Sequence, residues 1–400
     1  MKIGIYVHIP FCISKCGYCS FVSRRWDESL ADRYWRAVVR EMNDFAAART
    51  PLVDNVDSFF FGGGTPSVLP AEHIASILEA SRRIFAVLPQ CEISLEANPG
   101  TLAKEKLLIY RSIGVNRISL GAQSFSDDEL AAIGRIHGAA QITESFALLR
   151  ECGFDNVNLD LILGLPGQTE RQWMANLDRA VALRPNHLSV YMLELNPKLP
   201  LHRAMQSGEC RIPDEDAVAD WYLQTLDFLQ SHGYAQYEIS NFALPGCECR
   251  HNLKYWLREP VLAFGAAAHS HDGTARYANV SSLEKYLSRV EDGRSPVEWR
   301  ESLGAGREFE ETLFLGLRLR CGLDWEAVRK EHLSDRMDAC EAVLQEMAAM
   351  GLVEWCDSRV RLTRRGMLLS NEVFQQFVRP EGMENGEGNP GRPRPIWHRE

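Results

Sequence analysis

The sequence predicts an α/β fold built on a parallel sheet, followed by a small helical domain with a wing-like hairpin. Up to about residue 195, short apolar runs alternate with amphipathic helical patterns. Strands that alternate with helices in this way form parallel sheets. From Arg307 to Val378 the pattern changes to helical stretches around two short strand-like pieces, Leu352–Trp355 and Val360–Leu362.

Six strands are predicted in the first part, each a short apolar run between turn residues. They are Ile3–Ile9, Ser58–Phe61, Glu92–Ala97, Arg117–Leu120, Asn156–Leu163 and His187–Leu193. Two of the helices between them are expected to begin with a capping box, at Ser126–Glu129 and at Thr169–Gln172. Residues 200–300, rich in Pro, Gly and His, are expected to be irregular and to cover the mouth of the sheet. The periodicity fits a closed barrel, a partly closed barrel or an open sheet equally.

The bulk composition narrows the class of protein. The chain has 400 residues, enough for one large domain and a smaller one, and its 45% apolar and 24% charged residues are typical of soluble globular proteins. The net charge of −10 and the lack of a basic stripe argue against nucleic acid as a partner. No secretory segment or transmembrane segment is found, so we expect a cytoplasmic location, which is compatible with peripheral membrane contact.

The cysteines indicate a reducing compartment and a metal site. There are eleven, an odd number that cannot all pair. Eight are scattered, and most of these are expected to be small buried hydrophobic residues. The other three, Cys12, Cys16 and Cys19, lie within eight residues just after the first predicted strand.

Three thiolates on one loop can bind three corners of an iron–sulfur cubane. No fourth cysteine is near, because the position two residues after Cys19 is Phe21. One iron would therefore remain open to another ligand. The competing interpretations are zinc, with His8 as a fourth ligand, and a disulfide.

The segment HIPFCISKCGYCSF, residues 8–21, resembles the HemN-like branch of the radical S-adenosylmethionine (SAM) proteins. The resemblance covers roughly residues 3–378 and implies a partial (β/α)6 barrel. It implies a core barrel over 1–230, a segment over the barrel mouth at 231–300 and a small C-terminal domain at 301–378. Residues 379–400 are polar and rich in Gly and Pro, so we expect a disordered tail there. One departure is Glu194–Pro200, where the family often has a Gly-Thr step.

The resemblance also implies the cofactors. A [4Fe–4S] cluster on Cys12, Cys16 and Cys19 would bind SAM at its open iron, and an electron from the cluster could cleave SAM to a 5′-deoxyadenosyl radical. An electron donor for the cluster is then a further partner.

A glycine triplet follows the second predicted strand, in Phe61–Ser67. Glycines there let the backbone approach a ligand closely, although a tight strand–helix turn explains them as well. By resemblance, this element, with Gly63, Gly64 and Thr65, holds the amino group of SAM.

Further polar residues stand at or after the ends of later strands, where barrel sites collect. An acidic residue there suits ribose hydroxyls, and an arginine suits a carboxylate. Helix caps or surface ion pairs are the alternative explanation for each one. By resemblance, the residues that contact SAM are Glu96, Gln123, Arg135 and Asp160, with Tyr6 and the backbone at Tyr18 as lesser contacts.

Two functions from different classes compete within this branch. One is the oxygen-independent coproporphyrinogen III dehydrogenase, which decarboxylates propionate side chains in porphyrin biosynthesis. The other is a heme-binding chaperone that passes heme to acceptor hemoproteins. The dehydrogenase carries an extra cysteine at the position of Phe21 and a long extension before its cysteines, whereas eleven residues precede Cys12 here. Both differences favour the chaperone.

The segment His251–Trp256 reads H-N-x-x-Y-W and resembles a motif of the chaperone branch. Imidazole is a common axial ligand of heme iron, so His251 is the predicted heme ligand, with Tyr255 and Trp256 as flat apolar surface. The alternative is that His251 holds a loop while the aromatic side chains fill the core. Other candidate ligands are Cys249 and the pair His269 and His271.

Overall fold

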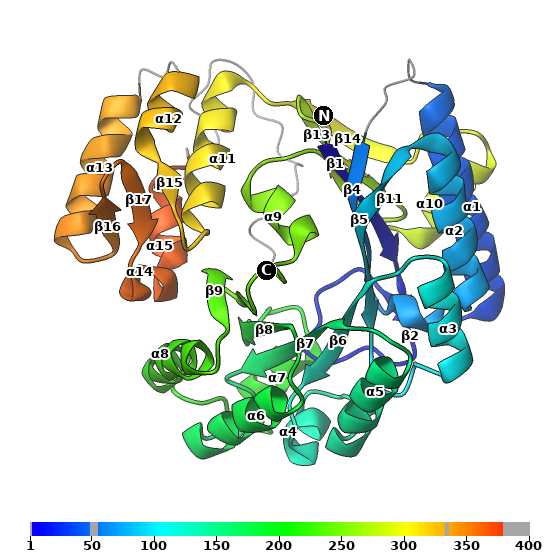
Figure 1. Ribbon diagram of the computed structural model, residues 1–400, viewed down its shortest axis with the longest axis horizontal. Helices are drawn as coiled ribbons and strands as arrows, with labels where there is room; N and C mark the ends of the chain where they lie inside the picture. Colours follow the sequence, from blue (N-terminus) through cyan, green and yellow to red (C-terminus); the bar gives the residue numbers. More distant parts are fainter. Residues whose placement is uncertain (1, 49–54, 333–335, 379–400) are drawn as a thin grey trace. The chain divides into compact units, whose positions relative to one another are not determined.

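The computed structural model describes residues 2–48, 55–332 and 336–378 (Figure 1). The chain divides into two compact units. The first comprises the chain up to Gln236 together with Ser240–Tyr255 and Glu259–Ser302, and the second comprises Tyr237–Ile239, Trp256–Arg258 and the chain from Leu303. The predicted disordered tail, 379–400, lies outside the described residues. Among the described residues, no helix is both long and apolar enough to cross a membrane.

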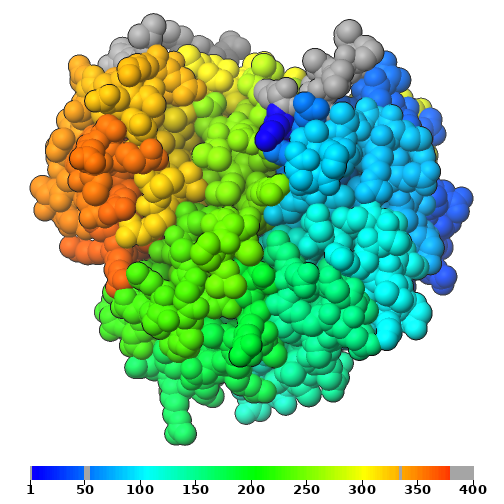
Figure 2. All heavy atoms as spheres, in the orientation of Figure 1, coloured from blue at the N-terminus to red at the C-terminus, as the bar shows by residue number. Residues whose placement is uncertain are grey.

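The six predicted strands are confirmed and lie side by side in one parallel array. In spatial order they are β1 (Lys2–Ile9), β4 (Asn55–Gly63), β5 (Ala86–Ala97), β6 (Arg117–Gln123), β7 (Asn156–Leu163) and β8 (His187–Met192). The helices that connect them lie along the outer side of the curved sheet in Figure 1. They are α1 (Glu28–Ala47), α2 (Ala71–Ile84), α3 (Lys104–Ser112), α4 (Asp127–Ala132), α5 (Ala139–Glu151) and α6 (Glu170–Ala182). In Figure 2 the colours follow the same chain order along this side of the molecule, from blue through cyan to green.

The expectation of irregular structure over residues 200–300 is wrong, because this stretch adds strands to both edges of the sheet. The full sheet has twelve strands in the order β14-β13-β12-β11-β1-β4-β5-β6-β7-β8-β10-β9. The added strands are β9 (Ala235–Glu238), β10 (Asn241–Ala243), β11 (Val261–Phe264), β12 (His269–His271), β13 (Ala275–Asn279) and β14 (Val297–Ser302). Among the added strands, β11 pairs in parallel with β1, which is one of the six predicted strands. Strand β10 pairs with β8 in the antiparallel direction. The division of the first unit at residue 230 stays a prediction.

The helices of the same stretch are α7 (Pro200–Gln206), α8 (Glu215–Ser231), α9 (Arg250–Trp256) and α10 (Leu283–Glu291). Helix α9 holds the H-N-x-x-Y-W segment. Its first two backbone N–H groups donate to the Glu92 carboxylate on β5, at 3.2 Å each. Glu92 thus supplies the acceptors that the start of a helix lacks.

The two predicted capping boxes differ in outcome. The Thr169 side chain accepts a hydrogen bond from the backbone N–H of Gln172, and the Gln172 side chain accepts one from Thr169, so that capping box is confirmed. The prediction for Ser126 is wrong, because its side chain makes no capping hydrogen bond to α4. The Ser126 backbone instead donates to the Ser124 hydroxyl, at 2.9 Å.

The second unit has the predicted helical character and hairpin. Strands β16 (Val353–Cys356) and β17 (Arg359–Leu362) form the hairpin, and β15 (Leu323–Asp324) pairs with β17. The helices are α11 (Ala305–Leu317), α12 (Trp325–Glu331), α13 (Met337–Ala349), α14 (Arg364–Leu368) and α15 (Ser370–Gln375). Trp256 belongs to this unit, where the Arg318 guanidinium lies 4.3 Å from the centre of its ring.

Candidate functional site

The three clustered cysteines lie on the loop that follows β1, and all three are free and partly exposed. Cys12 ends β2 (Phe11–Cys12), which pairs with β3 (Arg24–Arg25) where the loop closes. The loop is also tied at its middle, because the Gly17 N–H donates to the Ile133 carbonyl at 3.2 Å. Among the described residues, no three His, Cys, Asp or Glu side chains surround one common metal position. A [4Fe–4S] cluster takes one sulfur on each of three irons, so its ligands need not meet at one point.

His8, the candidate fourth ligand for zinc, has partners for both ring nitrogens. Its Nδ1 lies 3.1 Å from the Tyr6 hydroxyl, and its Nε2 lies 2.8 Å from the Val22 carbonyl. Burial lowers the pKa of His8, so the ring is neutral. His8 therefore connects β1 to the far end of the cysteine loop.

The glycine turn after β4 packs directly on β1 and the cysteine loop. The N–H groups of Gly64 and Thr65 donate to the carbonyls of Ile9 and Phe11, at 2.8 Å each. Gly63 has φ +115°, and a Cβ atom there would lie 2.6 Å from the His8 ring. A side chain at this position is thus excluded by both backbone conformation and space. The glycines therefore allow both the tight turn and its close approach to the cysteine loop.

Glu96 and Asp160 are buried near the carboxyl ends of their strands. Glu96 accepts a hydrogen bond from the Gly63 N–H at 3.0 Å, and Asp160 accepts one from Asn158 at 2.7 Å. Burial, together with the charge of Asp160, raises the pKa of Glu96 to about 8. Burial also raises the pKa of Asp160, although the Asn158 hydrogen bond opposes the shift. Two carboxyl groups that are costly to ionise without a cation are thus held in the same region.

Arg135 reaches from the loop after α4 toward the cysteines. One Nη atom lies 3.6 Å from the Cys16 sulfur, and the other donates to the Gly121 carbonyl at 2.7 Å and to the Asn98 side chain at 3.0 Å. Its Nε is buried and has no hydrogen-bond partner in the described part of the chain. Such an orphaned buried donor suits an anionic group of a ligand. Gln123, at the end of β6, has φ +67°, a conformation that is rare for a residue with a side chain.

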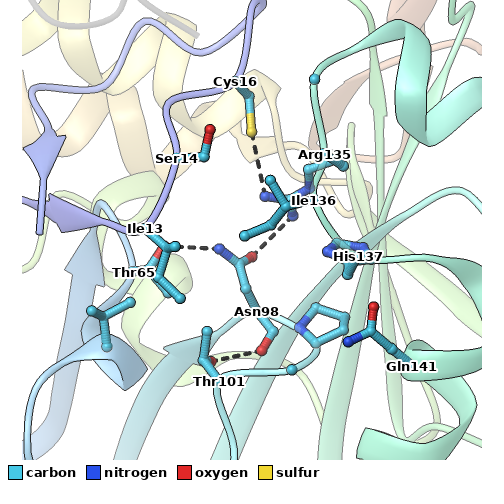
Figure 3. Close-up of a pocket in the computed structure, with 14 residues that line it drawn as sticks. Ile13, Ser14, Cys16, Thr65, Asn98, Thr101, Arg135, Ile136, His137 and Gln141 are labelled. Atoms are coloured by element: carbon cyan, nitrogen blue, oxygen red, sulfur yellow. Dashed lines mark hydrogen bonds between the residues drawn. The ribbon is translucent and has the colours of Figure 1, made fainter.

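A pocket beside the cysteine loop gathers part of this set (Figure 3). Its lining includes Cys16, Thr65 and Arg135, which the sequence singles out, and also Asn98. Glu96, Gln123 and Asp160 are not among the residues that line it. Asn98 is not among the site residues predicted from the sequence, although it stands two residues after Glu96 at the same strand end. Its position immediately before Pro99 and Gly100 was the available signal.

The aromatic and imidazole groups of the site stack inside the first unit. The Tyr6 ring lies over Phe60 and His251, with centroid distances of 6.2 and 6.3 Å. His251 is 1% exposed. Its Nδ1 lies 3.1 Å from the Ser58 hydroxyl and its Nε2 lies 3.2 Å from the Tyr255 hydroxyl. His251 thus sits in the interior with both ring nitrogens engaged.

The other groups predicted near a heme are placed differently. Cys249 is fully buried, with its sulfur 3.5 Å from the Glu92 carboxylate. His271 is buried on β12, whereas His269 on the same strand is partly exposed and lies against Trp299. Tyr18 packs against a buried apolar cluster that includes Ile162 and Leu165.

Comparison with known proteins matches two parts of the chain to family models and nearly all of it to one set of relatives. The family model of the radical SAM superfamily matches residues 6–180, and that of the HemN C-terminal domain matches residues 308–369. A heme chaperone HemW of Bacillus subtilis is 36% identical over 93% of this chain and 98% of its own length. The heme chaperone HemW of Escherichia coli is 33% identical over 94% of this chain and 98% of its own length.

Among solved structures, the coproporphyrinogen III oxidase HemN of Escherichia coli superposes with a TM-score of 0.83 at 25% identity, covering 94% of this chain and 90% of that one. The fold, a radical SAM barrel with a HemN-type C-terminal domain, is therefore shared with that enzyme. The heme chaperones are more similar in sequence and are covered over 98% of their own length, and the chain belongs to the HemW family of the radical SAM superfamily.

Proposed function

We propose that this protein is a heme chaperone that binds a [4Fe–4S] cluster, SAM and heme, and passes heme to acceptor hemoproteins in the cytoplasm. The observation that carries the cofactor part is the contact of Arg135 and Thr65, two predicted SAM-binding residues, with the sulfurs of Cys16 and Cys12. The proposed cluster ligands and the proposed SAM-binding side chains are thus joined by hydrogen bonds.

The cysteine loop fits a cluster because its three thiols are free and partly exposed on one anchored loop. Cluster ligands are thiolates, whereas burial raises the pKa of the Cys12 and Cys19 thiols. The hydrogen bond from Thr65 opposes the shift at Cys12, and bound iron would supply the remaining positive charge. The bound cluster supplies single electrons and one iron with an open position. An electron donor is therefore a further proposed partner.

The residues around the cysteine loop also fit SAM. Arg135 offers its orphaned Nε to the carboxylate, and the turn at Gly63 and Gly64 brings backbone close to the amino group. Glu96 and Asp160 offer carboxylates that would become easier to ionise beside the sulfonium and ammonium charges of SAM. In this arrangement the protein positions SAM and limits water at its reacting end.

The chaperone part of the proposal rests on Phe21 and on the relatives. The Phe21 side chain is 62% exposed, so the position at which the dehydrogenase has its extra cysteine holds an apolar group in contact with solvent. His251 stays the proposed axial ligand of heme. Ligation through Nε2 would replace its hydrogen bond with Tyr255, and ligation through Nδ1 would replace the one with Ser58.

Anaerobic reconstitution followed by heme titration tests the proposal. The holo-protein should bind heme stoichiometrically and pass it to an apo-hemoprotein. It should not decarboxylate coproporphyrinogen III with SAM and a reductant. Formation of protoporphyrinogen IX would overturn the chaperone assignment and favour the dehydrogenase, the alternative that the structural likeness to HemN supports.

A further inference from the structure

We infer that Asn98 is the central link of a hydrogen-bonded chain between two cluster sulfurs, and that through this chain it sets the reduction potential of the cluster and the orientation of Arg135. The inference rests on the proposed cluster and SAM site and adds a positioning residue to it. The chain runs from Cys12 through Thr65, Asn98 and Arg135 to Cys16.

Each step of the chain is a short polar contact, and Figure 3 shows its middle part. The Thr65 hydroxyl lies 3.5 Å from the Cys12 sulfur, and the Asn98 amide nitrogen lies 2.8 Å from that hydroxyl. On the other side, Arg135 donates to the Asn98 amide oxygen at 3.0 Å and to the Cys16 sulfur at 3.6 Å. Thr65 is 2% exposed, so little water competes for its hydroxyl.

The direction of the hydrogen bonds follows from the chemistry of the groups. An arginine has donors only, so the side-chain oxygen of Asn98 must face Arg135. The amide NH2 of Asn98 then faces Thr65 and donates to its hydroxyl oxygen. The Thr65 hydroxyl hydrogen is thereby left to donate to the Cys12 sulfur. Both ends of the chain consequently present a hydrogen to a sulfur.

Asn98 is itself fixed by its backbone. The Thr101 hydroxyl donates to the Asn98 carbonyl at 2.6 Å, and the Asn98 N–H donates to the Ser67 hydroxyl at 3.4 Å. The two hydroxyls lie 2.5 Å apart. The amide is therefore attached to a rigid turn after β5, which suits a group that orients two others.

Hydrogen bonds to cluster sulfurs stabilise the more negative, reduced state and so raise the reduction potential. Among side chains of this size, an amide alone combines the acceptor that Arg135 needs with the donor that Thr65 needs. An aspartate at position 98 would accept the Thr65 hydroxyl hydrogen, turn it away from Cys12 and add a negative charge. A leucine would remove both contacts without adding charge.

The test is an anaerobic redox titration of the reconstituted protein without SAM, following the one-electron reduction of the cluster by a chemical reductant. We expect a more negative midpoint potential for Asn98→Leu than for wild type, and a still more negative one for Asn98→Asp. The affinity for SAM should fall by about threefold to tenfold in Asn98→Leu, since Arg135 loses one partner that orients it.

Asn116→Ala is the matched control. Asn116 also bridges two polar groups, donating to the Cys91 carbonyl and accepting from the Ile93 N–H, but it contacts no cluster sulfur. The midpoint potential of the cluster in Asn116→Ala should equal that in wild type. Equal potentials for wild type and both Asn98 variants at full iron content would overturn the inference. If Asn98→Leu does not fold, Asn98→Ala, which also removes both contacts without adding charge, takes its place. A wild-type protein that binds no cluster would instead refute the proposed function.

Discussion

The Glu96 carboxylate accepts a hydrogen bond from the backbone N–H of Gly63, with 3.0 Å between oxygen and nitrogen. This contact joins the end of β5 to the glycine turn after β4, and so joins two elements that the sequence predicts to bind SAM. Because Glu96 is buried and lies near Asp160, its pKa is raised to about 8. The free protein therefore holds Glu96 largely protonated at neutral pH.

This protonation predicts a pH dependence of SAM binding. SAM carries ammonium and sulfonium charges that favour the ionised carboxylate, so binding should lower the pKa of Glu96 and release a proton. The affinity for SAM should then rise with pH up to about 8, the value for the free protein, and level off above it. Calorimetry in two buffers of different ionisation enthalpy would measure the released proton. Glu96→Gln should release fewer protons and show a smaller rise, because only Asp160 of the two carboxyl groups remains.

The loss of Glu96 or Asp160 should also weaken SAM binding directly. A hydrogen bond to a charged group is typically worth about 1.5–3 kcal/mol, so Glu96→Ala and Asp160→Ala should each reduce the affinity roughly tenfold to a hundredfold. Equilibrium binding to the anaerobic holo-protein measures this. Unchanged affinity in both variants would contradict the placement of SAM at these strand ends.

The cysteine loop should carry all of the iron. Replacing Cys12, Cys16 and Cys19 by Ala should abolish bound iron and the visible absorption of the cluster after anaerobic reconstitution. The triple variant Cys210→Ala, Cys247→Ala, Cys321→Ala is a control, since these residues are also partly or fully exposed. The control should keep iron and sulfide at wild-type levels, and wild-type levels in the Cys12, Cys16 and Cys19 variant would refute the assignment.

The heme ligand can be identified from the Soret band. Burial, with the charge of Lys254, lowers the pKa of His251 to about 3, so the imidazole is neutral and able to ligate iron at any physiological pH. His251→Ala should shift the Soret maximum, whereas His269→Ala should not. Tyr255→Phe removes only the partner of Nε2 and should leave the maximum in place. A wild-type spectrum for His251→Ala would place the ligand elsewhere while leaving the chaperone proposal intact.

The two predicted capping boxes give a paired stability test. Thr169→Ala removes a capping hydrogen bond and should lower the free energy of unfolding by about 1 kcal/mol. Ser126→Ala should change it by much less, because the Ser126 side chain makes no capping hydrogen bond. Urea unfolding of both variants measures the difference. Equal losses of unfolding free energy would mean that both predicted capping boxes form, as the local sequence suggests.

The sequence by itself determined what depends on neighbours along the chain. The six parallel strands, the capping box at Thr169 and the hairpin near Val360 follow from the apolar period and from turn residues, which act over a few positions. The cysteine spacing and the glycine triplet likewise act locally. These features were enough to indicate the family and the side of the sheet on which the site lies.

Tertiary structure alone decided which groups meet. Strand β12 has three residues, too few for an apolar period to predict it, and it is a strand because it pairs with β11 and β13. Asn98 gains its place only because the ends of β4, β5 and β6 bring Thr65 and Arg135 to its two sides. His251 looks like an available ligand in the sequence, but α9 carries it into the interior, where Ser58 and Tyr255 engage its ring. The contacts of Asn98, and that of His251 with Ser58, join residues 33 to 193 positions apart, and no local pattern encodes them.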